Sequence, residues 1–596
     1  MQAQAQAEQV LKEKFGYDHF RAGQDTAIDR VLAGENTLVV MPTGGGKSLC
    51  YQIPALMLPG LTVVVSPLIA LMKDQVDALN DNGIAATFIN SSIDFREMDE
   101  RLRQAAMGEV KLLYVAPERF ESDQFVTELN DINVSLLAID EAHCISQWGH
   151  DFRPSYLSLS TVPQRLTSKP AVIALTATAT PRVAADIRQR LGIPDDGMVN
   201  TGFERTNLSF QVIRDQDEDR YLSQYLKLNQ DQSGIIYAST RKEVDRLYTM
   251  LAKKKLPVAR YHAGMSDADR AASQEDFLFE RKPIMIATNA FGMGIDKSNV
   301  RFVIHAQLPK DLESYYQEAG RAGRDGLPSE AILLYKPKDV MLQRFFIDNS
   351  EADEAHRRLQ YQKLQTMIQY ANTGECLQQF ILNYFGQTGT KPCGRCSNCL
   401  DEREAVDVTT DAQKVLSCVV RMHSRYGKAL IAQVLTGSHN QRIQEWHLDE
   451  LSTYGLMQNQ SQRDVTTFID FLTASGFLQT NGGQFPTLGL TETGAEVLRG
   501  NQSVYRKTAM KARQSLAVDD DTFQALRAVR RQLAEQSKLP PYMIFSDATL
   551  KAISAAKPTT LNEMLAVKGV GEVKLEKYGQ FFLDALTEHA EETNAS

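Results

Sequence analysis

The chain has 596 residues, which at roughly 150 residues per domain corresponds to about four domains. A content of 43% hydrophobic and 23% charged residues, with 36 glycines and 20 prolines, excludes a collagen-like or wholly disordered chain. The net charge of −9 leaves nucleic-acid binding open, because such binding follows local patches. The N-terminal residues lack a basic stretch followed by an apolar one, and no apolar run approaches the ~20 residues that span a bilayer. We therefore expect a cytoplasmic protein that makes no membrane contact.

Two regions of alternating strands and helices come first. Residues 1–202 and 203–340 alternate short β-branched runs with amphipathic stretches, which predicts two α/β lobes with parallel sheets. The strands expected in the first lobe are Thr37–Met41, Thr62–Ser66, Lys111–Ala116, Leu136–Asp140 and Ala171–Thr176. Those expected in the second lobe are Ser233–Ala238, Val258–His262, Pro283–Thr288, Arg301–Ala306 and Ala331–Lys336. Two similar lobes suggest a cleft between them.

Smaller modules follow the two lobes. Residues 341–403 are helical and polar and end in a cysteine cluster, which predicts a small metal-binding module. Residues 404–500 combine short helices with a hairpin turn at Asn481-Gly482-Gly483, the order of a winged helix. We expect residues 501–518 to be a linker and residues 519–596 to form a small all-helical unit.

A glycine-rich segment follows the first predicted strand and precedes a helical stretch, the setting that a phosphate-binding loop requires. Its residues are Pro42, Thr43, Gly44, Gly45, Gly46, Lys47 and Ser48. The glycines let backbone N–H groups close around phosphates, Lys47 can neutralise them and Ser48 can ligate Mg²⁺. The strict pattern has glycine where this chain has Met41.

Two carboxylates, Asp140 and Glu141, end another apolar strand about a hundred residues later. In open α/β folds this edge of the sheet is where ligands bind. We expect Asp140 to hold Mg²⁺ and Glu141 to orient or deprotonate an attacking water. An Asp-Glu pair alone is common at surfaces, but the phosphate loop makes the combination specific.

Four of the seven cysteines are clustered and suggest a metal site. They are Cys376, Cys393, Cys396 and Cys399. Four thiolates with tight turns between them are typical of a closed structural Zn²⁺ site, and an iron–sulfur cluster is the alternative. The remaining cysteines, Cys50, Cys144 and Cys418, are expected to be buried thiols.

In these motifs the chain resembles superfamily 2 helicases, and specifically the RecQ family of DNA helicases, from Phe15 to about Phe582. The resemblance favours zinc in the cysteine cluster and implies two RecA-like lobes, a zinc module, a winged helix and an HRDC domain. It also implies that Tyr17 and Arg21 sandwich an adenine while Gln24 reads its edge. The cofactors it implies are ATP, Mg²⁺ and Zn²⁺.

Further segments are similar to family motifs that bind DNA or complete the ATP site. The segment Cys144–Arg153 resembles the aromatic-rich loop that couples single-stranded DNA binding to hydrolysis, with Trp148, Phe152 and Arg153 as its contacts. Segments 66–75, 114–119 and 176–179 resemble strand-end motifs that touch DNA or link it to the nucleotide site. Segments 289–297 and 317–326 resemble helicase motifs V and VI, in which Arg321 and Arg324 are expected to share a helical face and reach the γ-phosphate.

In the region expected to form the winged helix, residues 411–442 contain five basic side chains and one acidic one. This surplus suggests a duplex-DNA surface that includes Arg425 and Arg442, and a solvated basic face is the alternative. Residues 519–596 resemble an HRDC domain, whose turn at Gly569-Val570-Gly571 could meet a phosphate or whose helices could bind protein.

Together the motifs predict an ATP-dependent DNA helicase that acts on single-stranded and duplex DNA. The family resemblance, and not the residues alone, implies 3′ to 5′ polarity. The resemblance implies roles in recombination, repair and replication, a monomeric state, and a single-stranded-DNA-binding protein as partner. An RNA helicase is one alternative, because Asp-Glu-Ala-His occurs there too. A DNA-binding scaffold that does not hydrolyse ATP is another, and the presence of Lys47, Glu141 and both arginines argues against it.

Overall fold

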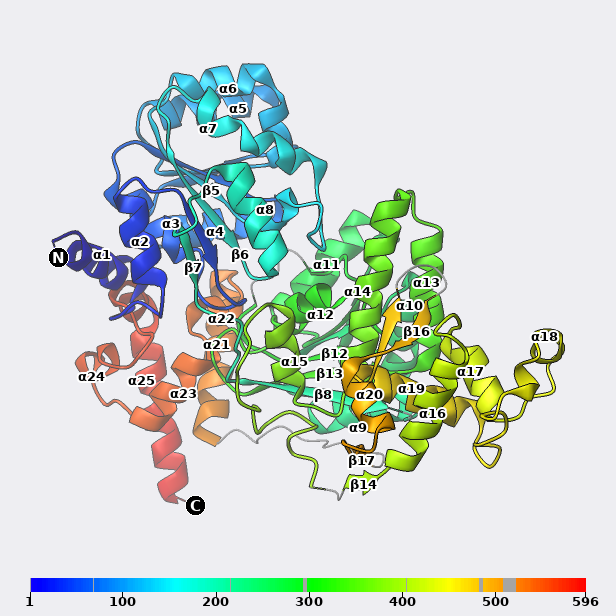
Figure 1. Ribbon diagram of the computed structural model, residues 1–596. Helices are drawn as coiled ribbons and strands as arrows, with labels where there is room; N and C mark the ends of the chain where they lie inside the picture. The colour runs from blue at the N-terminus through cyan, green and yellow to red at the C-terminus, as the bar shows by residue number, and fades with distance from the viewer. Residues whose placement is uncertain are drawn as a thin grey trace.

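The computed structural model describes residues 2–67, 69–214, 216–292, 297–402, 405–481, 486–507 and 521–595. Within these ranges two parallel α/β lobes are followed by a helical module, a winged-helix unit and a small helical bundle (Figure 1). The prediction of two parallel-sheet lobes with smaller modules after them is confirmed. None of the helices in the described part of the chain is long and apolar enough to cross a membrane.

The first lobe is built on a parallel sheet of strand order β3-β4-β2-β5-β6-β1-β7. Its strands are β1 (Thr37–Val40), β2 (Leu61–Val65), β3 (Ala86–Ile89), β4 (Leu112–Val115), β5 (Val134–Ile139), β6 (Ala171–Thr176) and β7 (Met198–Asn200). Its helices are α1 (Gln2–Val10), α2 (Gln24–Leu32), α3 (Leu49–Met57), α4 (Ile69–Asp81), α5 (Phe95–Ala106), α6 (Asp123–Asn130), α7 (Val162–Arg165) and α8 (Pro181–Leu191). The central strands are almost entirely buried because helices cover both faces of the sheet.

The second lobe has the parallel order β10-β11-β9-β12-β13-β8. Its strands are β8 (Leu208–Arg214), β9 (Ser233–Tyr237), β10 (Val258–Tyr261), β11 (Ile284–Ala287), β12 (Val300–His305) and β13 (Ser329–Tyr335). Its helices are α9 (Glu218–Leu228), α10 (Arg241–Lys253), α11 (Asp267–Leu278) and α12 (Leu312–Ala319). Strands β3, β7 and β8 were not predicted from the sequence.

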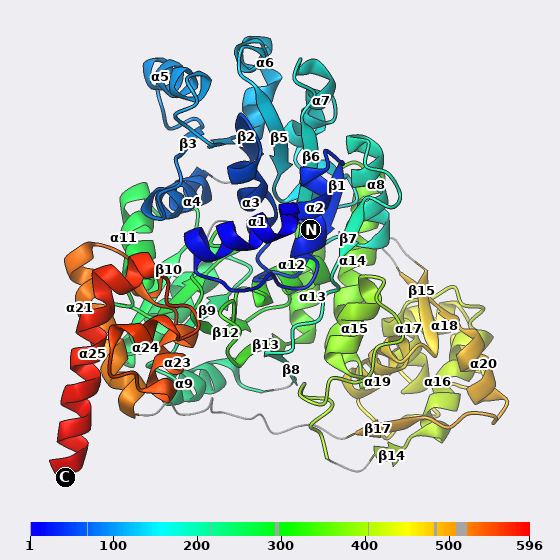
Figure 2. The ribbon, with the colours of Figure 1, turned by 90° about the vertical axis from the view of Figure 1, so that its left-hand side faces the viewer.

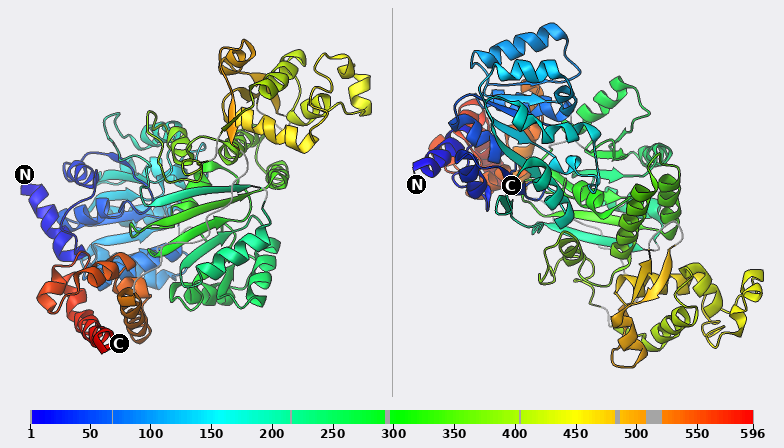
Figure 3. Two further views of the ribbon diagram at one scale, coloured as in Figure 1. Left: turned by 90° about the horizontal axis from the view of Figure 1, so that it is seen from below. Right: turned by 45° about the horizontal axis from the view of Figure 1, so that its top comes forward.

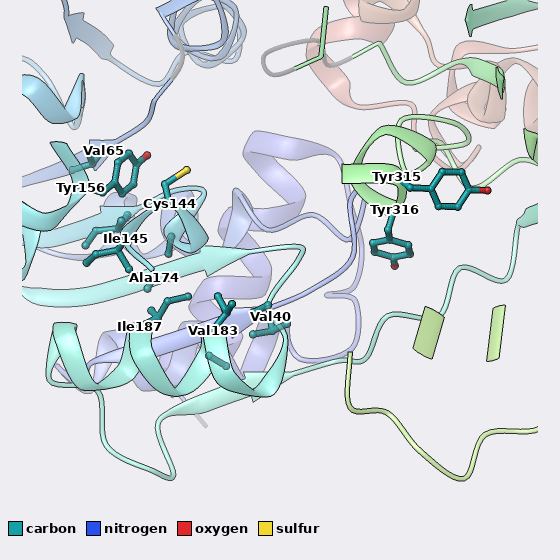
Figure 4. Close-up of a cluster of buried hydrophobic side chains, with 14 of the residues drawn as sticks. Val40, Val65, Cys144, Ile145, Tyr156, Ala174, Val183, Ile187, Tyr315 and Tyr316 are labelled. Atoms are coloured by element: carbon teal, nitrogen blue, oxygen red, sulfur yellow. The ribbon is translucent and has the colours of Figure 1, made fainter. Parts of the chain in front are cut away.

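The helical module packs against the second lobe. It comprises α13 (Pro337–Asp348), α14 (Glu354–Asn372) and α15 (Leu377–Tyr384). One continuous apolar cluster joins it to both lobes, and Phe203 stacks on Phe385 with 4.5 Å between ring centroids. Figure 4 shows side chains of this cluster, with Val40 and Val183 in the first lobe and Tyr315 and Tyr316 in the second. The shared cluster therefore fixes how the lobes face each other.

The winged-helix unit and the C-terminal bundle each have their own apolar core. The first contains β14 (Ala405–Asp407), α16 (Thr409–Arg421), α17 (Lys428–Leu435), α18 (Gln441–Glu445), α19 (Gln462–Ala474), β15 (Leu478–Asn481), β16 (Thr487–Leu490), α20 (Glu492–Leu498) and β17 (Tyr505–Lys507). The second contains α21 (Asp521–Ser537), α22 (Pro541–Ile544), α23 (Asp547–Ala556), α24 (Leu561–Leu565) and α25 (Glu572–Ala595). The two units lie on opposite sides of the lobes (Figure 3).

One segment differs from its expected role as a linker. Residues Tyr505–Lys507 form strand β17, which pairs antiparallel with β14 at the start of the winged-helix unit. The backbone hydrogen bonds of this pairing tie both ends of the unit together, so the unit extends past residue 500. Residues 508–518 of the expected linker lie outside the described residues.

Candidate functional site

A cavity of about 300 Å³ lies between the two lobes and collects most of the predicted nucleotide-site residues. The first lobe supplies the phosphate loop and the two carboxylates, and the second supplies both arginines. The predicted residues that line the cavity are Tyr17, Arg21, Gln24, Thr43, Gly44, Gly46, Lys47, Ser48, Asp140, Glu141, Arg321 and Arg324. Side chains far apart in the sequence therefore meet in one site.

The phosphate loop follows β1 and leads into α3. Gly44 and Gly46 both have φ of 80°, in the left-handed region that favours glycine. A Cβ at Gly46 would also lie 2.4 Å from the amide nitrogen of Gln24. Half-buried Lys47 has its Nζ 3.3 Å from the carbonyl oxygen of Met41. Burial lowers the pKa of Lys47, and the nearby charges of Glu141 and Asp140 oppose that shift.

The carboxylates lie at the carboxyl end of β5 and line the same cavity as the phosphate loop. Burial, reinforced by the charge of Glu141, raises the pKa of Asp140 to about 7, although Lys47 lowers it. Glu141 has a left-handed backbone with φ of 49°, and its N–H donates to Asp140 Oδ1 at 3.0 Å. This turn directs both carboxylates toward the same part of the cavity. Two acids so placed suit the binding of a divalent cation and the activation of a water molecule.

A pair of histidines connects the carboxylates to the second lobe. Nδ1 of His143 lies 3.3 Å from Oε2 of Glu141. The His143 ring stacks on His150 with 4.4 Å between centroids, and His150 Nε2 lies 3.2 Å from Oε1 of Gln317. A movement of one lobe relative to the other would therefore change the position of Glu141 through this series of side-chain contacts.

The predicted adenine motif lies beside the phosphate loop. Gln24 is buried, and its amide nitrogen donates to the carbonyl oxygen of Gly46 at 2.9 Å. Arg21 Nη1 donates to the carbonyl oxygen of Gly44 at 2.5 Å. Tyr17 is 44% exposed at the rim. Gln24 and Arg21 thus stabilise the phosphate loop by hydrogen bonds and also line the cavity.

The prediction that Arg321 and Arg324 share a helical face is wrong. Helix α12 ends at Ala319, and both arginines lie in the turns that follow it. Those turns still bring them to the cavity, and a Cβ at Gly44 would lie 3.2 Å from Arg324 Cα. Residues 293–296 of the predicted motif V lie outside the described residues.

Arg205 is a functional candidate that sequence reasoning missed. One guanidinium nitrogen, Nη1, donates to the carbonyl oxygens of Thr43 at 2.7 Å and Gly320 at 3.1 Å. The other, Nη2, donates to Ala322 at 2.8 Å. A single buried side chain thus joins the phosphate loop to the arginine-bearing turns. No local motif marks it, because its partners lie over a hundred residues away in sequence.

The predicted aromatic loop follows the carboxylates and reaches the second lobe and the helical module. Trp148 is 38% exposed, and its carbonyl oxygen accepts from Lys363 Nζ at 2.9 Å. Phe152 is half-buried, and Arg153 pairs with Asp151 at 3.1 Å. Arg182 of α8, which the sequence analysis did not single out, places its guanidinium carbon 3.2 Å from the Trp148 ring centroid.

The four predicted metal ligands come together. The Sγ atoms of Cys376, Cys393, Cys396 and Cys399 all lie within 4.8 Å of one another. Backbone N–H groups donate to these sulfurs, including Cys393 N to Cys376 Sγ at 3.2 Å. Four thiols so close together, with N–H donors that favour the thiolate form, fit a tetrahedral Zn²⁺ site.

The basic surplus of the winged-helix unit is smaller than its sequence suggests. Lys428 pairs with Asp470 at 2.6 Å, and Lys414 pairs with Asp411 at 2.8 Å. Arg425 and Arg442 remain exposed, and Arg442 lies 5.3 Å from the Trp446 ring centroid. The tip of the predicted wing, residues 482–485, lies outside the described residues.

The C-terminal bundle contacts both lobes (Figure 2). Glu280 of the second lobe, whose side chain is 1% exposed, is approached by Arg527 at 3.4 Å and Arg530 at 3.8 Å from α21. On the first lobe, a Cβ at Gly16 would lie 3.3 Å from Gly571 Cα. The turn that was expected to meet a phosphate is therefore packed against the first lobe.

Comparisons with known proteins agree with this architecture. The chain matches a DEAD/DEAH box helicase domain at 21–187, a helicase conserved C-terminal domain at 217–326, a RecQ zinc-binding domain at 337–400, an RQC domain at 402–515 and an HRDC domain at 519–586. ATP-dependent DNA helicase RecQ of Bacillus subtilis is 50% identical over 99% of each chain. The protein of the same name from Haemophilus influenzae is 42% identical over 97% of this chain and 95% of its own. The chain therefore belongs to the RecQ family of helicases.

Proposed function

We propose that the chain is an ATP-dependent DNA helicase that moves 3′ to 5′ on one strand and unwinds duplex DNA. The observation that carries this proposal is the cavity between the lobes, which combines a phosphate loop and two carboxylates with arginines of the other lobe. Because the site needs both lobes, hydrolysis there is coupled to lobe movement. Both relatives described above carry the name of ATP-dependent DNA helicase RecQ.

Each residue of the cavity has a role in this proposal. Lys47 and the amides of residues 43–48 hold the phosphates, and Ser48 and Asp140 hold Mg²⁺. Glu141 orients and deprotonates the attacking water, while Arg321 and Arg324 stabilise charge on the transferred phosphoryl group. Tyr17 and Arg21 enclose the base, and Gln24 reads its edge and positions the loop.

The cysteine cluster is proposed to hold a structural Zn²⁺. Four sulfur ligands leave no open coordination position, so the ion would stabilise the module without taking part in hydrolysis. The rival iron–sulfur cluster absorbs visible light, whereas Zn²⁺ does not, so metal analysis with an absorption spectrum distinguishes them.

The DNA is proposed to contact two surfaces. Trp148, Phe152 and Arg153 meet the single strand beside the catalytic acids, and Arg425 and Arg442 meet the duplex. We also propose a monomer that works in the cytoplasm, in recombination, repair and replication, with a single-stranded-DNA-binding protein as partner. The five modules are proposed to have boundaries near residues 202, 340, 403 and 518, with the winged-helix unit extended to Lys507.

The test is strand separation on matched DNA duplexes that carry a 3′ or a 5′ single-stranded tail, with Lys47→Ala as the control. ATP-dependent separation of the 3′-tailed duplex alone, lost in the variant, is the expected result. Separation of RNA duplexes instead would favour an RNA helicase. DNA binding without ATP hydrolysis would favour a scaffold.

A further inference from the structure

Arg182 occupies the ring face on which a DNA base would stack. Its guanidinium carbon lies 3.2 Å from the centroid of the Trp148 ring, too close for another planar group to enter between them. Arg182 is exposed, so this contact does not arise from burial in the core. A base can stack on this face of Trp148 only after the guanidinium has moved.

The position of Arg182 in α8 indicates that the Trp148 ring, and not the helix, stabilises the positive charge of its guanidinium. Arg182 is the second residue of α8, whose first turn is capped by Thr180. A helix N-terminus disfavours a cation by a few tenths of a kcal/mol or more. A stacked indole offsets this cost, because its face attracts a guanidinium.

The two partners of this stack are fixed from opposite sides. The backbone of Trp148 is held by Lys363 of α14, as described above. The start of α8 is fixed by the chain that follows α15, since a Cβ at Gly386 would lie 2.6 Å from Cγ of Pro181. The Arg182 side chain is therefore the part of this contact that can swing away while both backbones stay in place.

We propose that Arg182 is a cap on Trp148 that single-stranded DNA must displace, so that it sets the DNA concentration at which the aromatic loop engages. This inference rests on the proposed DNA contact of Trp148. The guanidinium, which has a planar face and a positive charge, acts as an intramolecular competitor of a base. Removing it exposes the indole and makes binding of single strands tighter.

The chain has two tryptophans, so a Trp446→Phe background leaves Trp148 as the sole indole emitter. In that background Arg182→Ala is expected to increase acrylamide quenching of Trp148 without DNA. It should also lower the single-stranded DNA concentration for half-maximal ATP hydrolysis by about 2- to 5-fold, the equivalent of one exposed cation–π contact. The matched control is Arg190→Ala on the same helix, where Arg190 pairs with Asp186, and it should change neither quantity.

Arg182→Lys separates stacking from charge. It keeps the charge but lacks the planar group, so a stacking cap predicts quenching close to that of the alanine variant. Weaker DNA binding by Arg182→Ala, with a shallower salt dependence, would overturn the proposal and make Arg182 a phosphate contact. Unchanged quenching in the DNA-free variants would also overturn it. If single-stranded DNA does not reduce acrylamide quenching of Trp148 in the Trp446→Phe protein, the proposed contact between the aromatic loop and DNA is wrong. The quenching measured without DNA still tests the Arg182–Trp148 stack by itself.

Discussion

Two clusters of buried charged side chains differ in how far opposite charges of the protein itself compensate each other. In the nucleotide cavity, burial raises the pKa of Asp140 to about 7 and lowers that of Lys47, so both groups shift toward their neutral forms. At the contact between the second lobe and the C-terminal bundle, burial would raise the pKa of Glu280, but Lys297, Arg530 and Arg527 hold it well below its usual range. A bound ligand can supply opposite charges to the first cluster, whereas the protein itself already supplies them in the second.

In the second cluster the pKa values of the carboxylate and of its nearest cation shift in the same direction. Lys297 is 3.3 Å from Glu280, yet burial lowers the pKa of Lys297 although Glu280 raises it. The two pKa values fall for different reasons: desolvation outweighs the carboxylates Glu280 and Asp547 at Lys297, whereas several cations together outweigh desolvation at Glu280. The carboxylate is therefore the group on which the contact depends.

The largest expected effect follows from Lys47→Ala. Loss of its charge beside the phosphates should lower ATP turnover by about 10³-fold, as for other groups that stabilise a transition state electrostatically. The folded protein should keep its stability, because the variant removes a buried ammonium whose charged form is disfavoured. Turnover assays and thermal unfolding check both halves. A marked loss of stability would mean that this cluster is as structural as the other.

Glu280→Ala should have the opposite profile. Removing the shared carboxylate leaves Lys297 and the arginines buried without it, at a cost of about 3–5 kcal/mol of stability. ATP turnover of the folded protein should fall far less than in Lys47→Ala. Urea unfolding measures the loss. The control is Glu275→Ala, whose exposed pair with Arg281 is worth about 0–1 kcal/mol. Equal effects of the two variants would contradict the comparison.

Much of the fold was predictable because its signals are local. The runs that form β1, β2 and β9 are buried along their whole length, and their ends fall within one residue of expectation. The short strands β14 and β17 carry no such signal. They exist because they pair with each other, and that pairing depends on the fold of everything between them.

The site divides in the same way. The phosphate loop, the Asp-Glu pair and the cysteines are short motifs whose chemistry is visible in sequence. Arg205 and Arg182 act through partners that only the tertiary structure brings near them. The buried ion cluster at Glu280 was not predicted for the same reason, since its cations come from the second lobe and from α21.

A smaller effect concerns Lys574, at the contact of the bundle with the first lobe. Burial lowers its pKa from 10.5 to about 8, while Asp81 opposes the shift. The folded state thus prefers the neutral amine, so its stability rises from pH 8 to 10.5 and the cost is fully present below pH 8.

Lys574→Met should remove this cost. At about 1.36 kcal/mol per pKa unit the shift is worth roughly 3 kcal/mol, and loss of the hydrogen bond to Met543 subtracts about 1. We expect a gain of about 2 kcal/mol at pH 7 that declines toward pH 10.5. Urea unfolding of both proteins at several pH values measures it. A gain independent of pH would mean that packing, not titration, is the cause.

The smallest effect is expected at the rim of the Glu280 cluster. Arg531 lies 3.6 Å from Glu280, but its side chain is 49% exposed, so water and salt screen its charge. Arg531→Ala should therefore cost no more than about 1 kcal/mol, and 0.5 M salt should remove most of the difference. Arg530, by contrast, is fully buried and also pairs with Asp547 at 2.8 Å, so Arg530→Ala should cost about 3–5 kcal/mol that salt does not restore. If Arg531→Ala and Arg530→Ala lost the same stability with the same salt dependence, exposure would not decide which cation stabilises Glu280. The distinction between a cluster whose charges the protein compensates and one that it does not would then lose its physical basis.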